Sequence, residues 1–248
     1  MGWLPVVMIF EPIFPTLVRA FFSQVTYGLG GPIIFTVRDV EIRLSSESIC
    51  RIFDIPSVGL KGYESKTWPI VSGFEPREAI QRMCGLVDAQ GIGKPSAHSL
   101  TMISRVLQHM ICSILLPQGG HRDEVSYLEA FFVDSILTKR WIHVGFFMMM
   151  HMISCCGARP VYSPTVVFSR VFKDVEVDLS KETNFEAPST YDTYDKQSLG
   201  WMKFEKAPDG SWIRRADRPP AQARGQGQVH PRVEEEVEIR ETEGGVNP

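Results

Sequence analysis

Residues 141–156 have the sequence WIHVGFFMMMHMISCC, and none of them is formally charged. The stretch is near the lower limit of the roughly 20 apolar residues that cross a bilayer as a helix. His143, Phe147, His151 and Cys155 follow one another at steps of four, which is typical of a buried helix with one weakly polar edge. The four methionines suit irregular packing in a protein core. The pattern favours a helix buried in a soluble core, with a membrane span as the alternative.

A metal site is a third interpretation of the same helix. His151 and Cys155 are one turn apart and could share an ion. His143 lies about 12 Å farther along the axis, and Cys156 points about 100° away from Cys155, so neither can join them. Two more ligands would have to come from elsewhere, and a packed cysteine beside a hydrogen-bonded histidine is the simpler interpretation. We therefore expect no metal and no cofactor.

Length, charge and cysteine usage limit the class of protein. The chain has 248 residues, a formal net charge of -3 and five cysteines. The cysteines are odd in number and lack the spacing of a disulfide framework, which indicates reduced thiols in a nuclear or cytoplasmic setting. The apolar N-terminus has no basic start, and Glu11, Pro12 and Pro15 interrupt it, so a secretory signal is not expected.

Two further segments in the centre of the chain have strong helical periodicity. Residues 99–117 are apolar on most of a helical surface, with one polar stripe that we expect to face solvent. The stripe comprises Thr101, Ser104, Arg105, Gln108 and Cys112. Residues 124–138 repeat the pattern, with Ser126, Glu129 and Asp134 expected to point outward. Together with residues 141–156, these segments predict three successive packed helices.

Shorter elements are predicted on both sides of this centre. Helices are expected at 15–25, 45–56, 76–89 and 163–172, a hairpin with an Arg-Asp turn at 33–44, a strand at 174–180 and a second hairpin at 200–215 that turns at 208–210. Pro15 and Pro76 suit first helical turns, and a serine precedes the short second helix. The fold class is therefore mainly α, a helical core domain with one or two short β-hairpins.

The end of the chain has a different composition. From about Arg214 the apolar content falls, and arginines are followed by a glutamate-rich run at 234–243. The chain is therefore divided into one helical domain, residues 1–213, and a disordered charged tail, residues 214–248.

The arginines of the tail are the one cationic cluster of the sequence. Arg214, Arg215, Arg218 and Arg224 alternate with glycine and glutamine and could follow a phosphate backbone. A solvated linker is the simpler interpretation, and the glutamate run would oppose nucleic acid. These four arginines are the candidate nucleic-acid contacts.

No catalytic motif is matched. The GIGKP at 91–95 resembles the end of a phosphate-binding loop, but Asp88 stands where the first glycine is needed and Pro95 follows Lys94. A nucleophile elbow and a zinc-knuckle spacing are absent from the sequence. The sequence predicts neither catalytic residues nor a small-molecule ligand, and so a protein that is not an enzyme.

The order of these segments resembles a known family. Residues 105–152, from RVLQHMICSILLP through EVSYLEAFFVDSILT to MMMHM, are similar to the plant transposon protein domain, a family associated with plant retrotransposons. EPIFPTLVRAFFSQV upstream and LGWMKFEKAPDGSWIRR downstream extend the resemblance to roughly residues 10–215. It implies a plant source, a mostly helical soluble domain and descent from a mobile element, and it brings no catalytic residue or cofactor.

These observations favour a non-enzymatic, mobile-element-derived domain with a role in protein association or in a coat. Self-association is the partner expected first. The alternative is a nucleic-acid-binding accessory protein that acts through the arginine-rich tail. A membrane anchor at 141–158 is a third interpretation, which we do not favour.

Overall fold

The structure is a computed structural model, and the part of it that can be described leaves several gaps. The described residues are 11–28, 31–63, 66–88, 91, 93–117, 123–156, 165–186, 199–200, 202–210 and 212–215. Within them the chain forms seven α-helices and two small antiparallel sheets. The predicted class, mainly α with short hairpins, is confirmed.

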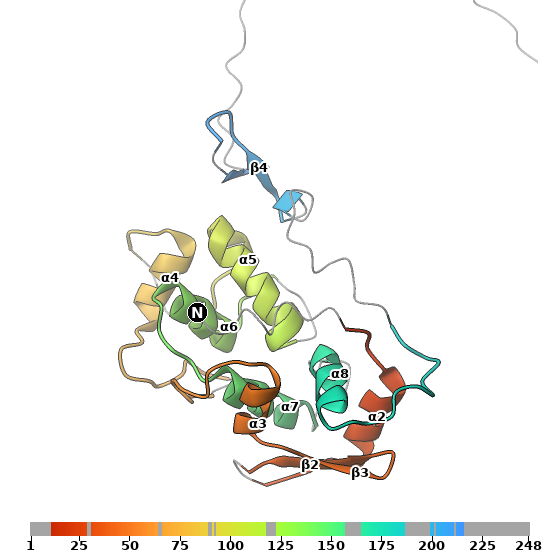
Figure 1. Ribbon diagram of the computed structural model, residues 1–248. Coiled ribbons are helices and arrows are strands. Elements are labelled where there is room, and N and C mark those ends of the chain that lie inside the picture. Colours follow the sequence, from red (N-terminus) through yellow and green to blue (C-terminus); the bar gives the residue numbers. More distant parts are fainter. Residues whose placement is uncertain are drawn as a thin grey trace, which may run out of the picture.

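Figure 1 shows the helices gathered between a sheet at one end of the molecule and a separate hairpin at the other. The helices are α2 (Pro15–Gln24), α3 (Ser46–Ile52), α4 (Pro76–Cys84), α5 (Met102–Met110), α6 (Tyr127–Leu137), α7 (Val144–Cys156) and α8 (Thr165–Asp174), with a 3-10 turn η1 (Ala97–Ser99) and a π-helical turn η2 (Ile111–Leu115) that continues α5. The strands are β1 (Thr26–Tyr27), β2 (Ile33–Val37), β3 (Val40–Leu44), β4 (Phe204–Lys206) and β5 (Trp212–Arg214).

The N-terminal elements pack around aromatic side chains. Helix α2 begins at Pro15, whose fixed φ suits a first turn, and it buries Phe21. The Phe21 ring lies edge-on to Phe35 of β2, with centroids 4.7 Å apart, and 4.5 Å from the ring of Phe168 in α8. Phe21 therefore contacts both the sheet and α8 from its place in α2. The predicted helix at 15–25 and the predicted hairpin at 33–44 are both confirmed.

Helix α3 begins at the predicted serine and crosses α7 closely. Ser45 and Ser48 form a reciprocal capping box, with backbone-to-hydroxyl distances of 3.1 and 2.7 Å. At the crossing, a Cβ added to Gly145 would lie 2.5 Å from the carbonyl oxygen of Ser46 and 2.6 Å from Cys50 Sγ. Only glycine at this position allows the two helices to approach so closely.

Helix α7 forms the greater part of the segment 141–156, from Val144 onward, and most of it is buried as predicted. Phe147 is fully enclosed, and its ring centroid lies 4.8 Å from that of Phe132 and 5.9 Å from that of Phe131 in α6. Among the described residues, every helix is too short or too polar to cross a membrane.

The predicted orientation of α5 is wrong. Ser104 and Gln108 of its polar stripe are 0% and 1% exposed, whereas Ile103 is 58% exposed. The polar stripe turns inward because α6 offers it a partner: Gln108 Nε2 donates to Glu129 Oε2 at 3.2 Å. Glu129, expected to face solvent, is therefore buried as well.

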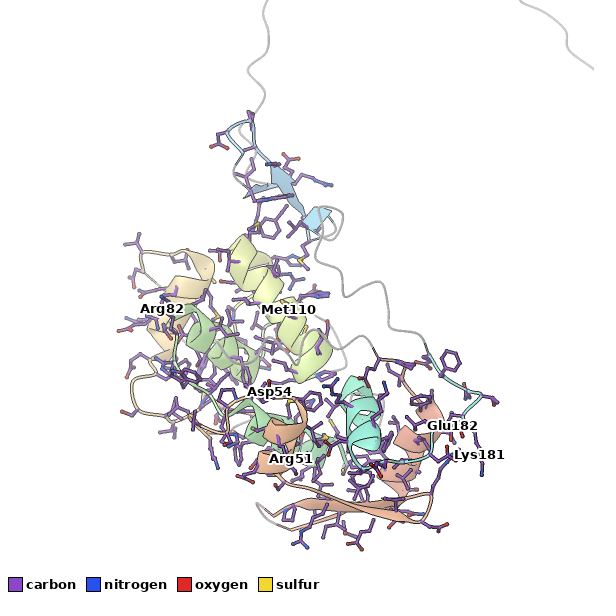
Figure 2. All side chains as sticks on the ribbon, viewed as in Figure 1. Arg51, Asp54, Arg82, Met110, Lys181 and Glu182 are labelled. Atoms are coloured by element: carbon purple, nitrogen blue, oxygen red, sulfur yellow. The ribbon has the colours of Figure 1, made fainter. Side chains whose placement is uncertain are left out.

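Asp134 of α6 also points inward, against expectation. Its side chain is completely buried and accepts from Arg82 Nε at 2.8 Å and Arg140 Nη1 at 3.2 Å. Arg82 belongs to α4, where Figure 2 labels it. A buried carboxylate is tolerated when cations and hydrogen bonds compensate for its lost hydration, and two arginines do so here.

The strand predicted at 174–180 is wrong, whereas the second hairpin is confirmed. Helix α8 runs to Asp174, and Val177 N then donates to the carbonyl oxygen of Phe172 at 2.9 Å. Glu176 has a φ of 57°, which breaks an extended conformation. The alternation of acids and aliphatics here reflects a helix terminus with Val177 buried, and not a pleated strand.

Candidate nucleic-acid interface

The β4–β5 hairpin supplies one wall of a basic pocket. Phe204 pairs with Arg214 in its register, and Gly210, with a φ of 87°, closes the turn through a 2.9 Å bond to the carbonyl oxygen of Ala207. This is the turn predicted at 208–210. The short strands bring Lys203 close to Arg214 and Arg215, because Arg215 N donates to the carbonyl oxygen of Lys203 at 2.9 Å.

Arg214 attaches the hairpin to the helical domain. Its guanidinium donates to the carbonyl oxygen of Leu100, immediately before α5, and lies 5.9 Å from the centroid of the Phe204 ring. Phe204 is buried, so the ring and the backbone carbonyl fix the arginine from two sides. Neither partner is an anion, so they do not neutralise the charge of the guanidinium at the pocket wall.

The facing wall comes from η1 and α5. Ser96 caps η1 by accepting from His98 N at 3.2 Å, and Thr101 caps α5 by accepting from Ser104 N at 3.3 Å. These two helix starts place His98 and Arg105 on the side that meets the hairpin. Arg105 Nη1 also donates to Gln108 Oε1 at 2.8 Å.

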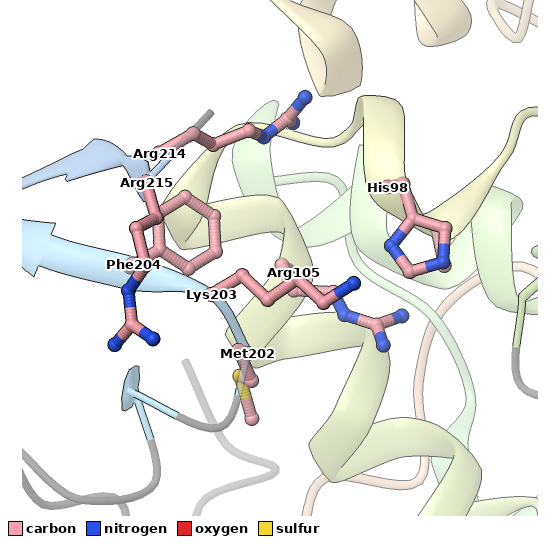
Figure 3. A pocket seen from close by; sticks show the side chains of 8 residues that line it. His98, Arg105, Met202, Lys203, Phe204, Arg214 and Arg215 are labelled. Carbon is pink, nitrogen blue, oxygen red and sulfur yellow. The ribbon is translucent and has the colours of Figure 1, made fainter. Parts of the chain in front are cut away.

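Together the two walls enclose a pocket of about 250 Å³, which Figure 3 shows from close by. Its lining residues are Ala97, His98, Arg105, Met202, Lys203, Phe204, Arg214 and Arg215. Two acids form ion pairs with this lining: Asp123 lies 3.3 Å from His98 Nε2, and Glu205 lies 3.9 Å from Arg215 Nε. Four arginine and lysine side chains therefore give the pocket a positive excess.

Two of the four arginines predicted as nucleic-acid contacts are among the described residues. The structure places Arg214 and Arg215 at the pocket, while Arg218 and Arg224 lie outside the described residues. The predicted tail boundary falls inside an element, since Arg214 is the last residue of β5. No local signal in the sequence marks His98 and Arg105, because they lie about a hundred residues from the hairpin and meet it only in the fold.

The polar edge of α7 forms a different, internal cluster. His151 Nε2 lies 2.9 Å from the carbonyl oxygen of Pro117 and 3.7 Å from Cys155 Sγ, and its Nδ1 lies 3.5 Å from the Tyr63 hydroxyl. Burial raises the pKa of the Cys155 thiol, which disfavours the reactive thiolate. Within the described part of the chain, no three His, Cys, Asp or Glu side chains are grouped so that they could hold a metal. The cluster is suited to hydrogen bonding inside the core.

Fold and pocket define a mainly helical domain that carries a basic pocket at one end. A family model described as "Putative plant retrotransposon-related domain" matches residues 1–182, and the chain belongs to this family. The association with plant retrotransposons expected from the sequence is confirmed. The match ends before the hairpin, so only the wall with His98 and Arg105 lies within it. Neither a curated protein nor a solved structure matches the chain.

Proposed function

We propose that this retrotransposon-related chain is a non-enzymatic accessory protein that binds nucleic acid through phosphate contacts at the basic pocket. The observation that carries the proposal is the convergence of Arg105, Lys203, Arg214 and Arg215 on one pocket from distant segments. Of the two functions expected from the sequence, this is the one for which the described residues offer a shaped site.

The chemistry of the lining suits phosphate groups. Arginine presents a planar fork of donors to phosphate oxygens, and lysine adds a mobile point charge. Lys203 is exposed and makes no ion pair with another described residue, so its ammonium is available to a ligand. Contacts of this kind track the backbone and not the bases, so binding would be largely independent of sequence.

Arg218 and Arg224 extend the proposal along the chain. They follow Arg215 by three and nine residues, and would add contacts to phosphates that leave the pocket. The glutamates at 234–243 would repel the same backbone, so net affinity depends on both parts of the tail.

No catalytic step is assigned, because no catalytic motif is matched in the sequence. Turnover of nucleic acid or nucleotide by the purified chain would contradict the non-enzymatic part of the proposal.

The experiment reverses two exposed charges of the pocket. Lys203→Glu/Arg215→Glu is compared with wild type in binding a labelled single-stranded RNA over a series of salt concentrations. We expect affinity to fall by about tenfold or more, and the slope of log affinity against log salt to shrink by about 0.7 for each phosphate that the variant no longer neutralises. Fluorescence anisotropy gives both quantities.

A matched control makes the same change in net charge elsewhere. Arg19 of α2 and Arg77 of α4 are exposed and lie away from the pocket lining. Arg19→Glu/Arg77→Glu should lower affinity only through the small effect of net charge. Equal losses in the two double variants, or unchanged binding in the pocket variant, would remove the pocket from the proposal.

A further inference from the structure

Among the described residues, strand β3 has an unpaired outer edge. The sheet has the order β1-β2-β3, so β3 pairs with β2 on one side alone. The β2–β3 turn has two residues, Arg38 and Asp39, both with positive φ, which is the geometry of a type I′ hairpin. Bonding alternates from there, so Ile42 bonds to β2 while the backbone groups of Glu41 and Arg43 point outward. No segment of the described chain pairs with that edge.

The side chains of this edge are divided cleanly between its two faces. Ile42 and Leu44 are each 1% exposed and anchor the strand in the core. Glu41 and Arg43 are exposed on the opposite face. Neither makes an ion pair or side-chain hydrogen bond with another described residue. One face of the edge is therefore anchored in the core, its outer backbone groups have no partner among the described residues, and its exposed face carries one acid and one base.

The order of these two charges is self-complementary. If a second copy pairs antiparallel with its Ile42 opposite Ile42, then Glu41 of each copy faces Arg43 of the other, and the backbone groups of both residues meet their partners. Sliding the second copy by two residues either way places Glu41 against Glu41 or Arg43 against Arg43, which is repulsive. The charges thus select one register and one partner strand.

From this geometry we propose that β3 is a dimerisation edge, through which two copies of the chain join their three-stranded sheets into one continuous antiparallel sheet. The contact is isologous, as a twofold dimer requires. A single pair of short strands buries little surface, so the dimer is weak and concentration-dependent. It supplies the self-association that a coat-like assembly needs, and it is independent of the basic pocket.

Charge exchange at the edge tests the proposal in the full chain. Glu41→Arg places two arginines on each copy, and Arg43→Glu places two glutamates, so each variant alone should dimerise about tenfold more weakly than wild type. An equimolar mixture of the two variants should regain association, because every pair across the edge is then opposite in charge. Analytical ultracentrifugation measures all three samples, with Arg77→Glu as a control that leaves association unchanged.

Two further measurements keep the result decisive. If circular dichroism shows that a single variant is unfolded, the double variant Glu41→Arg/Arg43→Glu takes its place, because it restores opposite charges across the edge. Two copies of the double variant should dimerise like wild type, whereas the double variant should not dimerise with wild type. Amide exchange at Glu41 and Arg43 should slow as concentration rises, while Ile42 stays unchanged because its amide bonds to β2. A wild type that is monomeric up to about 1 mM, or a dimer insensitive to both charge changes, overturns the proposal.

Discussion

At Glu129, burial and hydrogen bonding act on the carboxyl group in opposite directions. It is 3% exposed, and its Oε2 accepts from Ser126 N at 3.1 Å and from Gln108 Nε2 at 3.2 Å. Burial raises the pKa of the Glu129 carboxyl, and the hydrogen bonds from Gln108 and Ser126 offset this only in part. The folded chain therefore holds the proton of Glu129 to a higher pH than the unfolded chain does.

The sign of the resulting pH dependence follows from this difference in pKa. Above the ordinary value of 4.5 the unfolded chain releases the proton first, so the free energy of unfolding falls as pH rises until Glu129 is ionised in the folded state too. Glu129→Gln removes this titration. In urea denaturation over that pH range, the free energy of unfolding of the variant should therefore rise relative to that of wild type as pH rises. As a control, Glu75→Gln changes an exposed residue and should keep the wild-type slope of unfolding free energy against pH. The same slope in Glu129→Gln would contradict the assignment of this pH dependence to Glu129.

At the scale of elements, helices α3 and α7 cross so closely at Gly145 that any side chain at this position would force them apart. A methyl group at Gly145 would lie 2.5 Å from the Ser46 carbonyl oxygen and 2.6 Å from Cys50 Sγ. Alanine is the better helix former by about 1 kcal/mol, but forcing the helices apart costs typically about 1–3 kcal/mol. Because these two effects oppose each other, we expect Gly145→Ala to lower the free energy of unfolding by up to about 2 kcal/mol, measured by chemical denaturation.

Two comparisons separate the steric cause from a general effect of alanine. In Gly145→Ala/Cys50→Ala the thiol is gone but the Ser46 carbonyl remains, so the double variant should show a coupling between the two sites that recovers part of the loss. Gly28→Ala serves as the control, because nothing lies within 4 Å of the added methyl group. A Gly145→Ala variant that is more stable than wild type by about 1 kcal/mol would mean that α3 can move away without cost.

The same scale shows what local sequence could predict and what it could not. Helix α2, the first hairpin and the capped start of α3 depend on Pro15, a two-residue turn and Ser45, which act on their immediate neighbours. The inward face of α5 depends on a partner in another helix. A polar stripe with Ser104 and Gln108 predicts a solvent-exposed face unless Glu129 is known to lie opposite it. The periodicity of one helix gives no information about the residues of another.

For the whole molecule, the core and the candidate site occupy different parts of the chain. The main hydrophobic cluster extends from Phe14 to Val177, within the family match, and contains no residue of the hairpin. Composition alone predicted Arg214 and Arg215 as contacts, but their pocket depends on a tertiary contact between Arg214 and the Leu100 carbonyl. Figure 1 shows the hairpin beyond one end of α5, at the opposite end of the molecule from the β1–β2–β3 sheet.

This division predicts that stability and nucleic-acid binding can be separated by truncation. A chain that ends at Ser198 loses the hairpin and the tail but keeps the whole cluster, so its free energy of unfolding should change by no more than about 1 kcal/mol. Its affinity for single-stranded RNA should fall at least as far as that of Lys203→Glu/Arg215→Glu.

A chain that ends at Arg215 retains the pocket without Arg218 and Arg224, so it should keep measurable binding with a shallower salt dependence. If the shorter chain binds as well as the longer one, the contacts lie on the helical domain; if it fails to unfold cooperatively, the hairpin belongs to the fold and not only to the site.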